Sequence, residues 1–427
     1  LRTVGRHTII GAYEATPGVW KVEVGGSPWI DSANDEDWGV DGLTVDLDAS
    51  EEVSNPYVIV ANTDNVLELH TTDDLLPTVG NDLVGVHTFR SLTVKDGAWL
   101  EFGEDRLVVE QPELGEISAG TVSGDLIPEN LIDAALASGG LVHSDNSISL
   151  QDVSLTNSSN ALITAPAVNV SGSVTLDGST LSLALDEPLK VLGDFTLTNA
   201  VLTVPSATRS PNVVHSLSLD VGGTLTVDAT SVIDLEGKGY PVNDWSGPDF
   251  TSGTSESSHG GGRRHEEENA YGRFERARFA GSAGERYNDS YPGQGGGFVE
   301  LLASTLQLDG VINAKGARGY RHGGAGGGVH IDVGTLSGAA TGQLLADGGV
   351  QRNPSASNYS AGAGGRVSIY SLNAIDYLGS ASAKSGTGDT AGAGTVYWHN
   401  LNEVYGDLVV DNGGGIAQVG STPLRTV

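Results

Sequence analysis

The residues best suited to hold a metal ion lie in an acidic stretch near the N-terminus, "DSANDEDWGVDG". Within it, Asp35, Asp37 and Asp41 are spaced by two and by four residues. Calcium binds several oxygen ligands offered by one flexible loop, so these three carboxylates are the candidate Ca2+ ligands. The EF-hand pattern is not met, because Gly39 takes its fifth position and Asp46 replaces its final Glu. A solvated acidic loop is the alternative interpretation.

Histidine and tyrosine side chains gather in the glycine-rich second half of the chain. The stretch "HGGGRRHEEENAYGRFERARF" contains His259, His265 and the glutamates at 266–268. Zinc ligands need a fixed spacing on a rigid element, which a charged glycine-rich loop does not supply, so we expect a solvated loop here. Six tyrosines recur in the glycine-rich loops, and we expect them to pack these loops against the repeats rather than to stack on sugars. They are Tyr240, Tyr271, Tyr287, Tyr291, Tyr320 and Tyr359.

The sequence patterns argue against an enzyme. Glycoside cleavage needs two carboxylates at a set separation, and acidic residues thin out along the clearest repeats. No G-x-S-x-G element is present, and "GAGGGV" and "GAGGRV" lack the strand-glycine-helix unit of a dinucleotide site. We therefore expect no catalytic residues and no cofactor beyond the candidate Ca2+. A polysaccharide-active β-helix enzyme, either lyase or glycosidase, is one alternative, and a carbohydrate-binding module is another.

Composition narrows the choice of partners. The 427 residues include no Cys, which excludes disulfides, thiolate metal sites and cysteine nucleophiles. Residues 1–237 contain 8 Lys and Arg against 36 Asp and Glu, a net charge of −28 out of −32 for the whole chain. Nucleic acids and anionic membranes are bound by basic surfaces, so we expect neither nucleic-acid binding nor membrane insertion. The lack of Cys, and Leu1 in place of Met, favour a processed or excerpted product that is secreted to the cell surface or to an extracellular fibre.

Short strands must position these side chains, because period-two alternation of apolar and polar residues dominates the sequence. We expect an N-terminal strand segment at 1–40, where "VWKVEVGG" alternates in this way. A small β module is predicted at 41–140. Its strands are expected to form hairpins around residues 62–65 and around Asp96-Gly97, and residues 128–138 are expected to form its single short helix.

Residues 141–411 show a repeated design that predicts a parallel β-helix, or β-solenoid. Units that begin at Gly295, Gly326, Gly364 and Gly392 each continue with an apolar strand, a turn and a second strand. One such unit is too short to bury its own apolar stripe, whereas stacked units bury Val, Leu and Ile in a shared interior. Glycine is expected where the chain turns with positive φ or where neighbouring coils approach closely. An antiparallel sandwich is the main rival fold.

Two further segments complete the predicted organisation. Residues 224–241 match residues 305–320 closely enough to be the same unit, so the stretch between them contains an insertion. We place this glycine-rich loop insertion at 240–294. Residues 412–427 are expected to be a linker that joins the next module, because "GDLVVDNGGGIAQVG" stays apolar and alternating, with no evident cap.

Several of these motifs occur together in one known class of proteins. The patterns "IDLEGKGYP", "GGGFVEL", "TLQLDGVINAKG" and "GGAGGGVHI" follow one another between about 213 and 400. This half of the chain resembles the glycine-rich β-solenoid repeat region of giant bacterial exported, adhesin-like surface proteins. The resemblance implies a secreted solenoid architecture, and it offers no catalytic residues to carry over.

The two ends of the chain share the sequence "LRTV", at residues 1–4 and 424–427. This repeat favours one period of a tandem array over coincidence. The function that we expect is therefore a structural or adhesive module of a large secreted surface or filament protein. Its expected partners are copies of itself, arranged head to tail, and surface polysaccharide.

Overall fold

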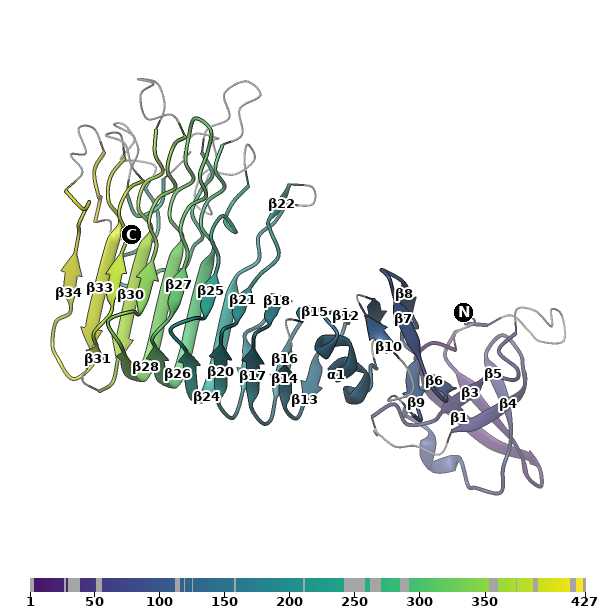
Figure 1. Cartoon of the computed structure of the whole chain (residues 1–427). Coiled ribbons are helices and arrows are strands. Elements are labelled where there is room, and N and C mark those ends of the chain that lie inside the picture. The colour runs from purple at the N-terminus through teal and green to yellow at the C-terminus, as the bar shows by residue number, and fades with distance from the viewer. Residues whose placement is uncertain are drawn as a thin grey trace. The chain divides into compact units, whose positions relative to one another are not determined.

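The computed structural model describes residues 4–26, 28–29, 39–50, 56–111, 116–118, 120–124, 126–156, 159–209, 212–241, 258–261, 270–284, 292–352, 360–373, 375–386, 391–414 and 420–424. The chain divides into two compact units, residues 1–146 and residues 147–427. The described residues form 34 strands, one α-helix and one 3-10 helix. This nearly all-β structure, with long and mostly parallel sheets, confirms the predicted class (Figure 1).

The first unit contains a sheet that closes on itself. Six strands pair in the ring order β1-β2-β5-β4-β3-β6 and back to β1, and every pairing in this ring is antiparallel. A seventh strand, β9, pairs in parallel with β6. Closure removes the exposed sheet edges to which other chains could add. The elements are β1 (His7–Thr16), β2 (Val19–Val24), β3 (Thr44–Asp46), β4 (Tyr57–Asn62), β5 (Val66–His70), η1 (Leu76–Thr78), β6 (Asp82–Phe89) and β9 (Arg106–Val109).

One hydrophobic core fills this closed sheet, and it combines both of the predicted N-terminal segments. Ile9 and Trp20, from the first 40 residues, lie in the same buried cluster as Leu47, Ile59 and Leu69. The predicted boundary at residue 40 therefore does not separate two structural parts. The predicted hairpin at 57–70 is confirmed as the antiparallel pair β4 and β5.

The remainder of the first unit contains short strands and the helix α1 (Glu129–Ala137), which agrees with the prediction for 128–138. Asp96 and Gly97 form the predicted turn, with φ angles of 57° and 78°. The strands on either side of this turn do not form a hairpin, because β7 pairs in parallel with β10 and β8 pairs in parallel with β11. The strands are β7 (Thr93–Lys95), β8 (Trp99–Glu101), β10 (Glu116–Ser118), β11 (Thr121–Ser123) and β12 (Leu141–His143).

In the second unit, the chain passes alternately through two parallel ladders of strands (Figure 1). The first ladder contains β13 (Ile148–Leu150), β14 (Val153–Leu155), β16 (Val168–Val170), β17 (Val174–Asp177), β19 (Leu189–Val191), β20 (Phe195–Thr198), β24 (Leu217–Val227), β26 (Phe298–Leu308), β28 (Gly328–Gly338), β30 (Arg366–Ser371), β31 (Asp376–Tyr377), β33 (Thr395–Asn400) and β34 (Asp407–Val409). The second contains β15 (Asn160–Ala165), β18 (Thr180–Leu185), β21 (Val201–Thr203), β25 (Val232–Asp234), β27 (Val311–Asn313), β29 (Gln343–Leu345) and β32 (Ser380–Ser382). A small separate hairpin joins β22 (Thr208–Arg209) to β23 (Asn212–Val213).

Most strands of the second unit pair in parallel with the equivalent strand of the preceding pass, in the register that the sequence repeats predict. Leu225 of β24 lies opposite Leu306 of β26, which lies opposite Leu336 of β28, and all three side chains are fully buried. Because side chains alternate between the two faces of a strand, every second residue joins such a stack. Continuous aliphatic stacks of this kind form the interior between the ladders.

Glycine-rich segments form a second, different interior in the later passes. These segments are extended but are not strands, and their backbone N–H groups bond in alternating directions. The N–H of Gly326 donates to Ala363 on the next pass (2.9 Å), whereas the N–H of Gly327 donates to Ala314 on a facing segment (2.7 Å). A Cβ atom on Gly326 would lie 1.9 Å from the carbonyl oxygen of Ala346. Close backbone approach therefore requires glycine here, since no described glycine between 292 and 400 has positive φ.

The predicted insertion at 240–294 contributes a further layer to this glycine-rich packing. The N–H of Gly281 donates to the carbonyl of Gly296 (2.8 Å), and the N–H of Gly261 donates to the carbonyl of Gly364 (3.0 Å). The described parts of the insertion, 240–241, 258–261, 270–284 and 292–294, are therefore built into the unit rather than forming only a surface loop.

Candidate interaction surface

Part of the insertion lies across the outer face of the first ladder. Arg276 forms an ion pair with Glu300 of β26 (Nη2 to Oε1, 3.1 Å). The backbone N–H of Ala277 donates to Ser368 Oγ of β30 (2.9 Å). The ring of Phe274 packs edge-on against a tyrosine of β33, with 5.4 Å between the centroids. Residues 270–284 thus fasten together strands from several successive passes.

A buried polar cluster lies beneath this segment. Arg366, at the start of β30, is 1% exposed, and its Nε donates to the carbonyl of Tyr271 (2.9 Å) while its Nη1 donates to Thr395 Oγ1 (3.2 Å). His259 is fully buried, and its ring stacks on that of Tyr271 with 4.8 Å between the centroids. The predicted solvated loop is therefore wrong for His259, because the loop folds inward against the glycine-rich segments. Tyr271 packs the insertion against the repeats, as predicted, whereas Tyr320 is 49% exposed. Tyr287, Tyr291 and Tyr359 lie outside the described residues.

Burial sets the protonation of this cluster. Loss of solvation, reinforced by the positive charge of Arg366, lowers the pKa of His259 to about 3. The ring is neutral at pH 7, and its Nδ1 lies 2.9 Å from the carbonyl oxygen of Gly326, so Nδ1 is the protonated nitrogen that donates this bond. Burial also lowers the pKa of Arg366 to about 10, while the carboxylate of Glu275 opposes the shift, so Arg366 stays charged at neutral pH.

Beside the insertion, the same outer face carries a partly exposed aromatic group. The rings of Tyr370, Tyr397 and His399 come from β30 and β33, and their centroids lie 5.6 to 5.9 Å apart. The Tyr370 hydroxyl donates to the carbonyl oxygen of Glu275, and burial raises the pKa of this hydroxyl to about 12. Such rings offer apolar faces together with polar edges, a combination that suits protein or carbohydrate surfaces.

Exposed apolar side chains concentrate at the C-terminal end of the second unit. Of the eleven exposed large hydrophobic residues described in this unit, eight lie between 372 and 424. They are Leu372, Leu378, Leu401, Val404, Tyr405, Val409, Val410 and Leu424. Exposed apolar patches on soluble domains mark interaction sites, so this end is the candidate interaction surface of the unit.

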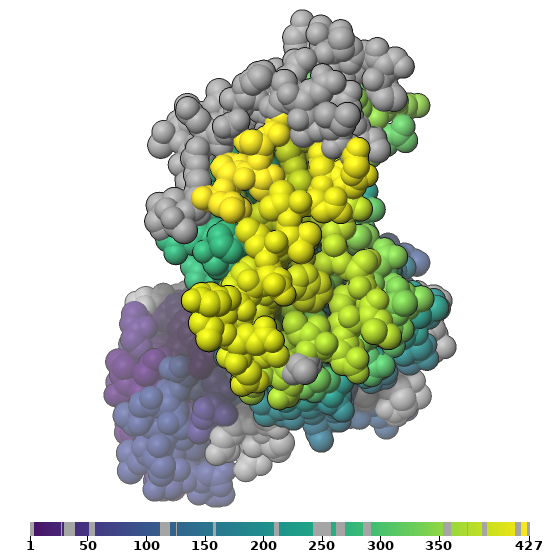
Figure 2. Space-filling model, turned by 90° about the vertical axis from the view of Figure 1, so that its left-hand side faces the viewer, coloured from purple at the N-terminus to yellow at the C-terminus, as the bar shows by residue number. Residues whose placement is uncertain are grey.

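The last described residues cover part of this end, contrary to the prediction that no cap is present. Strand β34 turns back and pairs antiparallel with β33, so the parallel series stops there. Asn412 Oδ1 accepts from the N–H of Ser385 (2.9 Å), and Thr422 Oγ1 donates to the carbonyl of Ala393 (2.6 Å). Figure 2 shows these C-terminal residues, in yellow, spread over the end of the unit that faces the viewer. The described residues of the predicted linker at 412–427 therefore pack on their own unit.

One hollow in the second unit gathers acidic side chains. Its lining includes the carboxylates of Asp186, Glu187 and Glu300 together with the apolar side chains of Leu183 and Phe298. Glu300 is already engaged, because it accepts from the Arg276 guanidinium. Asp186 and Glu187 are the other two carboxylates in its lining.

The predicted calcium ligands are only partly visible. Asp35 and Asp37 lie outside the described residues. Asp41 is half-buried in a turn, and its Oδ1 atom is buried without a hydrogen-bond partner among the described residues. No group of three His, Cys, Asp or Glu side chains arranged to hold a metal ion occurs in the ranges that the structure describes. The calcium site stays a prediction.

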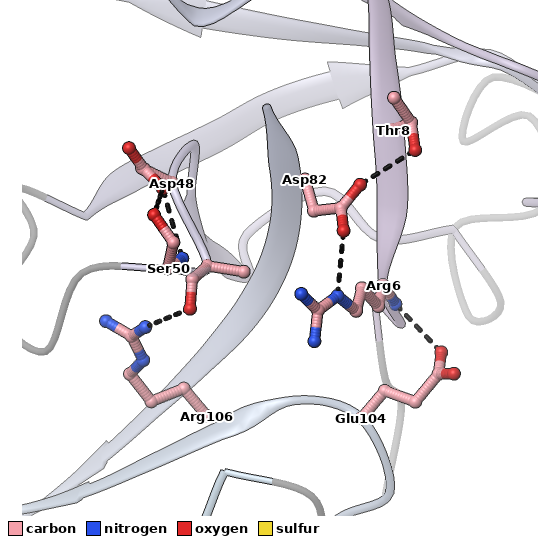
Figure 3. A network of polar contacts seen from close by, with 8 residues as sticks. Arg6, Thr8, Asp48, Ser50, Asp82, Glu104 and Arg106 are labelled. Atoms are coloured by element: carbon pink, nitrogen blue, oxygen red, sulfur yellow. Dashed lines mark hydrogen bonds and ion pairs between the residues drawn. The ribbon is translucent and has the colours of Figure 1, made fainter. Parts of the chain in front are cut away.

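Acidic side chains of the first unit instead accept hydrogen bonds from the N-terminal segment of the same unit (Figure 3). Asp82 accepts hydrogen bonds from Arg6 Nε (3.0 Å) and from Thr8 Oγ1 (2.7 Å). Both bonds lower the pKa of Asp82, and the bond from Thr8 has the larger effect. The backbone N–H of Arg6 donates to Glu104 (3.0 Å). Fully buried Asp105 accepts from two further backbone N–H groups of this N-terminal segment, those of residues 4 and 5. These carboxylates stabilise β1 in the closed sheet and are occupied by protein donors.

Sequence reasoning missed Arg366 and the burial of His259. Arg366 directly follows the glycines of its unit, at a ladder position where the neighbouring passes have Gly328 and Thr395. A large cation between the small residues of the two adjacent passes was the available signal. Its partner, Tyr271, is far away in sequence and was not predictable by spacing.

Comparisons with models of known protein families, with curated proteins and with solved structures find no match to this chain. In the part of the chain that the structure describes, no helix is long and apolar enough to cross a membrane.

Proposed function

We propose that the second unit is a β-solenoid and that the protein is a structural, adhesive module of a secreted surface or filament protein, which binds copies of itself head to tail. The observation that carries this proposal is the parallel pairing in the first ladder, which links successive passes from β13 to β33. Such a stack spans distance with a repetitive interior and presents its varied side chains outward. Extension and display are the functions that this architecture serves best.

The outer face supports an adhesive role. The rings of Tyr370, Tyr397 and His399 are partly exposed beside the insertion, where they can stack on sugar rings of a surface polysaccharide. The strongly acidic chain disfavours anionic partners and favours neutral or cationic ones.

The experiment incubates the full chain with neutral and acidic polysaccharides and measures both retention on the polymer and the release of reducing ends or unsaturated products. A structural, adhesive module is expected to show retention without turnover. Exchange of Tyr397 for Ala should then weaken retention, with the equally polar Tyr320→Ala as control. Turnover that scales with protein concentration would refute the proposal.

A polysaccharide-active enzyme is the second candidate, and the acidic hollow of the second unit favours it. Asp186 and Glu187 lie in this hollow beside apolar residues, an arrangement in which one carboxylate could act as acid and another as base. Any turnover found in the screen should be abolished by Asp186→Asn or Glu187→Gln if this hollow is the active site.

A further inference from the structure

The C-terminal end of the second unit combines a strand edge that no described strand covers with exposed apolar side chains. Strand β34 is the last strand of its ladder, and among the described residues only β33 pairs with it. Val409 in β34 is 45% exposed, and the adjacent Val410 is 48% exposed. An edge of this kind offers unpaired N–H and C=O groups to another strand.

Two neighbouring loops extend this edge into a wider apolar area. Val404 is 82% exposed and Tyr405 is 84% exposed in the loop that follows β33, and Leu401 begins this loop. The N–H of Leu401 donates to the carbonyl of Ser371 (2.8 Å), which holds the loop beside exposed Leu372 of the preceding pass. We name the residues Leu372, Leu401, Val404, Tyr405 and Val409 the terminal ledge.

We propose that the terminal ledge is the surface on which a second copy of this chain docks, by adding an extended segment to the β34 edge and covering the apolar side chains. This inference rests on the proposed head-to-tail assembly, and it names the surface that one copy contributes.

The chemistry of the ledge points to a polypeptide partner. Backbone N–H and C=O groups along a strand edge are matched in spacing by another strand, and not by a sugar chain or a small ligand. A small hollow beside Val409 is also lined by Lys384 and Asp411. The loop residues of the ledge line neither this hollow nor the acidic one, so these loops offer a surface rather than a pocket.

The repeats of this chain point to a second copy as that partner. Residues 224–227 already pair in register with residues 305–308, so one unit of the chain binds another of the same design. Segments of a second copy carry the same period-two alternation and the same strand spacing. The net charge of −32 opposes this association at long range, so salt should strengthen it by screening the repulsion.

The experiment is sedimentation equilibrium of the full chain over a wide range of protein concentration, at low and at high salt. The variant combines Val404→Ser, Tyr405→Ser and Val409→Ser, which leave the net charge unchanged. Leu192→Ser is the matched control, because Leu192 is 72% exposed in the same unit but far from the ledge in sequence. Wild type and control should self-associate, more strongly at high salt, and the triple variant should associate at least about tenfold more weakly.

Three outcomes would overturn the inference. If the triple variant associates as wild type does, another surface joins the copies, although the proposed self-assembly stands. Association that weakens with salt would indicate contact between opposite charges instead of this ledge. A wild-type chain that stays monomeric throughout would overturn docking between copies altogether. If the triple variant is unfolded by far-UV circular dichroism, the single variant Val404→Ser replaces it in the same experiment. A side chain that is 82% exposed contributes little to folding, so this variant should stay folded.

Discussion

The second unit contains two interiors that exclude water by opposite means. Between the ladders, large side chains such as Leu225, Leu306 and Leu336 stack from one pass to the next. In the glycine-rich layers, backbones approach so closely that a single Cβ atom does not fit, as at Gly326 and Gly362. The first interior derives its stability mainly from apolar burial, and the second from backbone hydrogen bonds and close contact.

The structural role of glycine also differs between the turns of the first unit and the glycine-rich layers of the second. In the first unit, eight described glycines, from Gly5 to Gly139, have positive φ and shape turns. In the glycine-rich layers between 292 and 400, no described glycine has positive φ. The same residue type is therefore selected for backbone conformation at these turns and for the absence of a side chain in the glycine-rich layers.

The largest effect is expected from Gly326→Ala in the glycine-rich layers. Its new Cβ would lie 1.9 Å from a backbone carbonyl oxygen that cannot rotate away, so neighbouring segments must separate. We expect the free energy of unfolding of the second unit to fall by about 3 kcal/mol or more. The control is Gly414→Ala, because an added Cβ at Gly414 has no atom within 4 Å, although φ is +80° there. This substitution should lower the free energy of unfolding by about 1 kcal/mol. Denaturant unfolding measures both, and equal effects would contradict the comparison.

A somewhat smaller effect is expected from Leu306→Ala in the aliphatic interior. This substitution leaves a cavity among fully buried neighbours, which relax only in part. The expected loss is about 2 to 4 kcal/mol, and Leu306→Ile, which conserves volume, should cost less than about 1.5 kcal/mol. Similar losses for both variants in the same denaturant assay would show that this interior is not closely packed.

A pH-dependent effect is expected at His259, which is buried against the glycine-rich segments. The pKa of this imidazole is 6.5 in the unfolded reference and about 3 in the folded protein. Between these values the unfolded state binds the additional proton, so stability falls as the pH is lowered through this range. At pH 5 the free energy of unfolding is expected to be about 2 kcal/mol lower than at pH 8. Melting temperatures of wild type and His259→Gln from pH 8 to pH 4 should converge, and parallel curves would contradict the burial of a neutral ring.

The smallest effect is expected from calcium removal, which acts on the first unit alone. If Asp35, Asp37 and Asp41 bind Ca2+ in the folded state only, a chelator must lower the melting temperature of that unit. Asp41→Asn should reduce the response to added Ca2+. An unchanged melting curve with and without chelator would show that the acidic loop is simply solvated.

The sequence was informative about local structure and much less so about which parts of the chain meet. Alternation and turn residues predicted the hairpin at 57–70, the helix at 128–138 and the register of 224–227 on 305–308. Local turn chemistry was not decisive, because Asp96 and Gly97 have the positive φ angles that suit a two-residue hairpin turn, yet the strands beside them form no hairpin. These strands pair in parallel with strands more than twenty residues later.

The candidate surface was harder to predict for a related reason. The C-terminal segment reads as one more alternating strand, and only the pairing of β34 with β33 reveals that it turns back. Likewise, the composition of the insertion predicts solvation, whereas contacts with residues about 70 to 100 positions later bury His259 and Tyr271. Such long-range contacts depend on the stacking of whole passes, which no local pattern encodes.

Amide hydrogen exchange of the unmodified chain tests the central claim most directly, because it asks whether the glycine-rich segments are interior. The N–H groups of Gly326, Gly327 and Gly365 donate backbone hydrogen bonds of 2.7 to 2.9 Å inside these layers. They should therefore exchange as slowly as the amides of β26 and β28, through cooperative opening of the unit. Exchange of these glycines at the rate of an exposed loop, while the strands stay protected, would contradict the account.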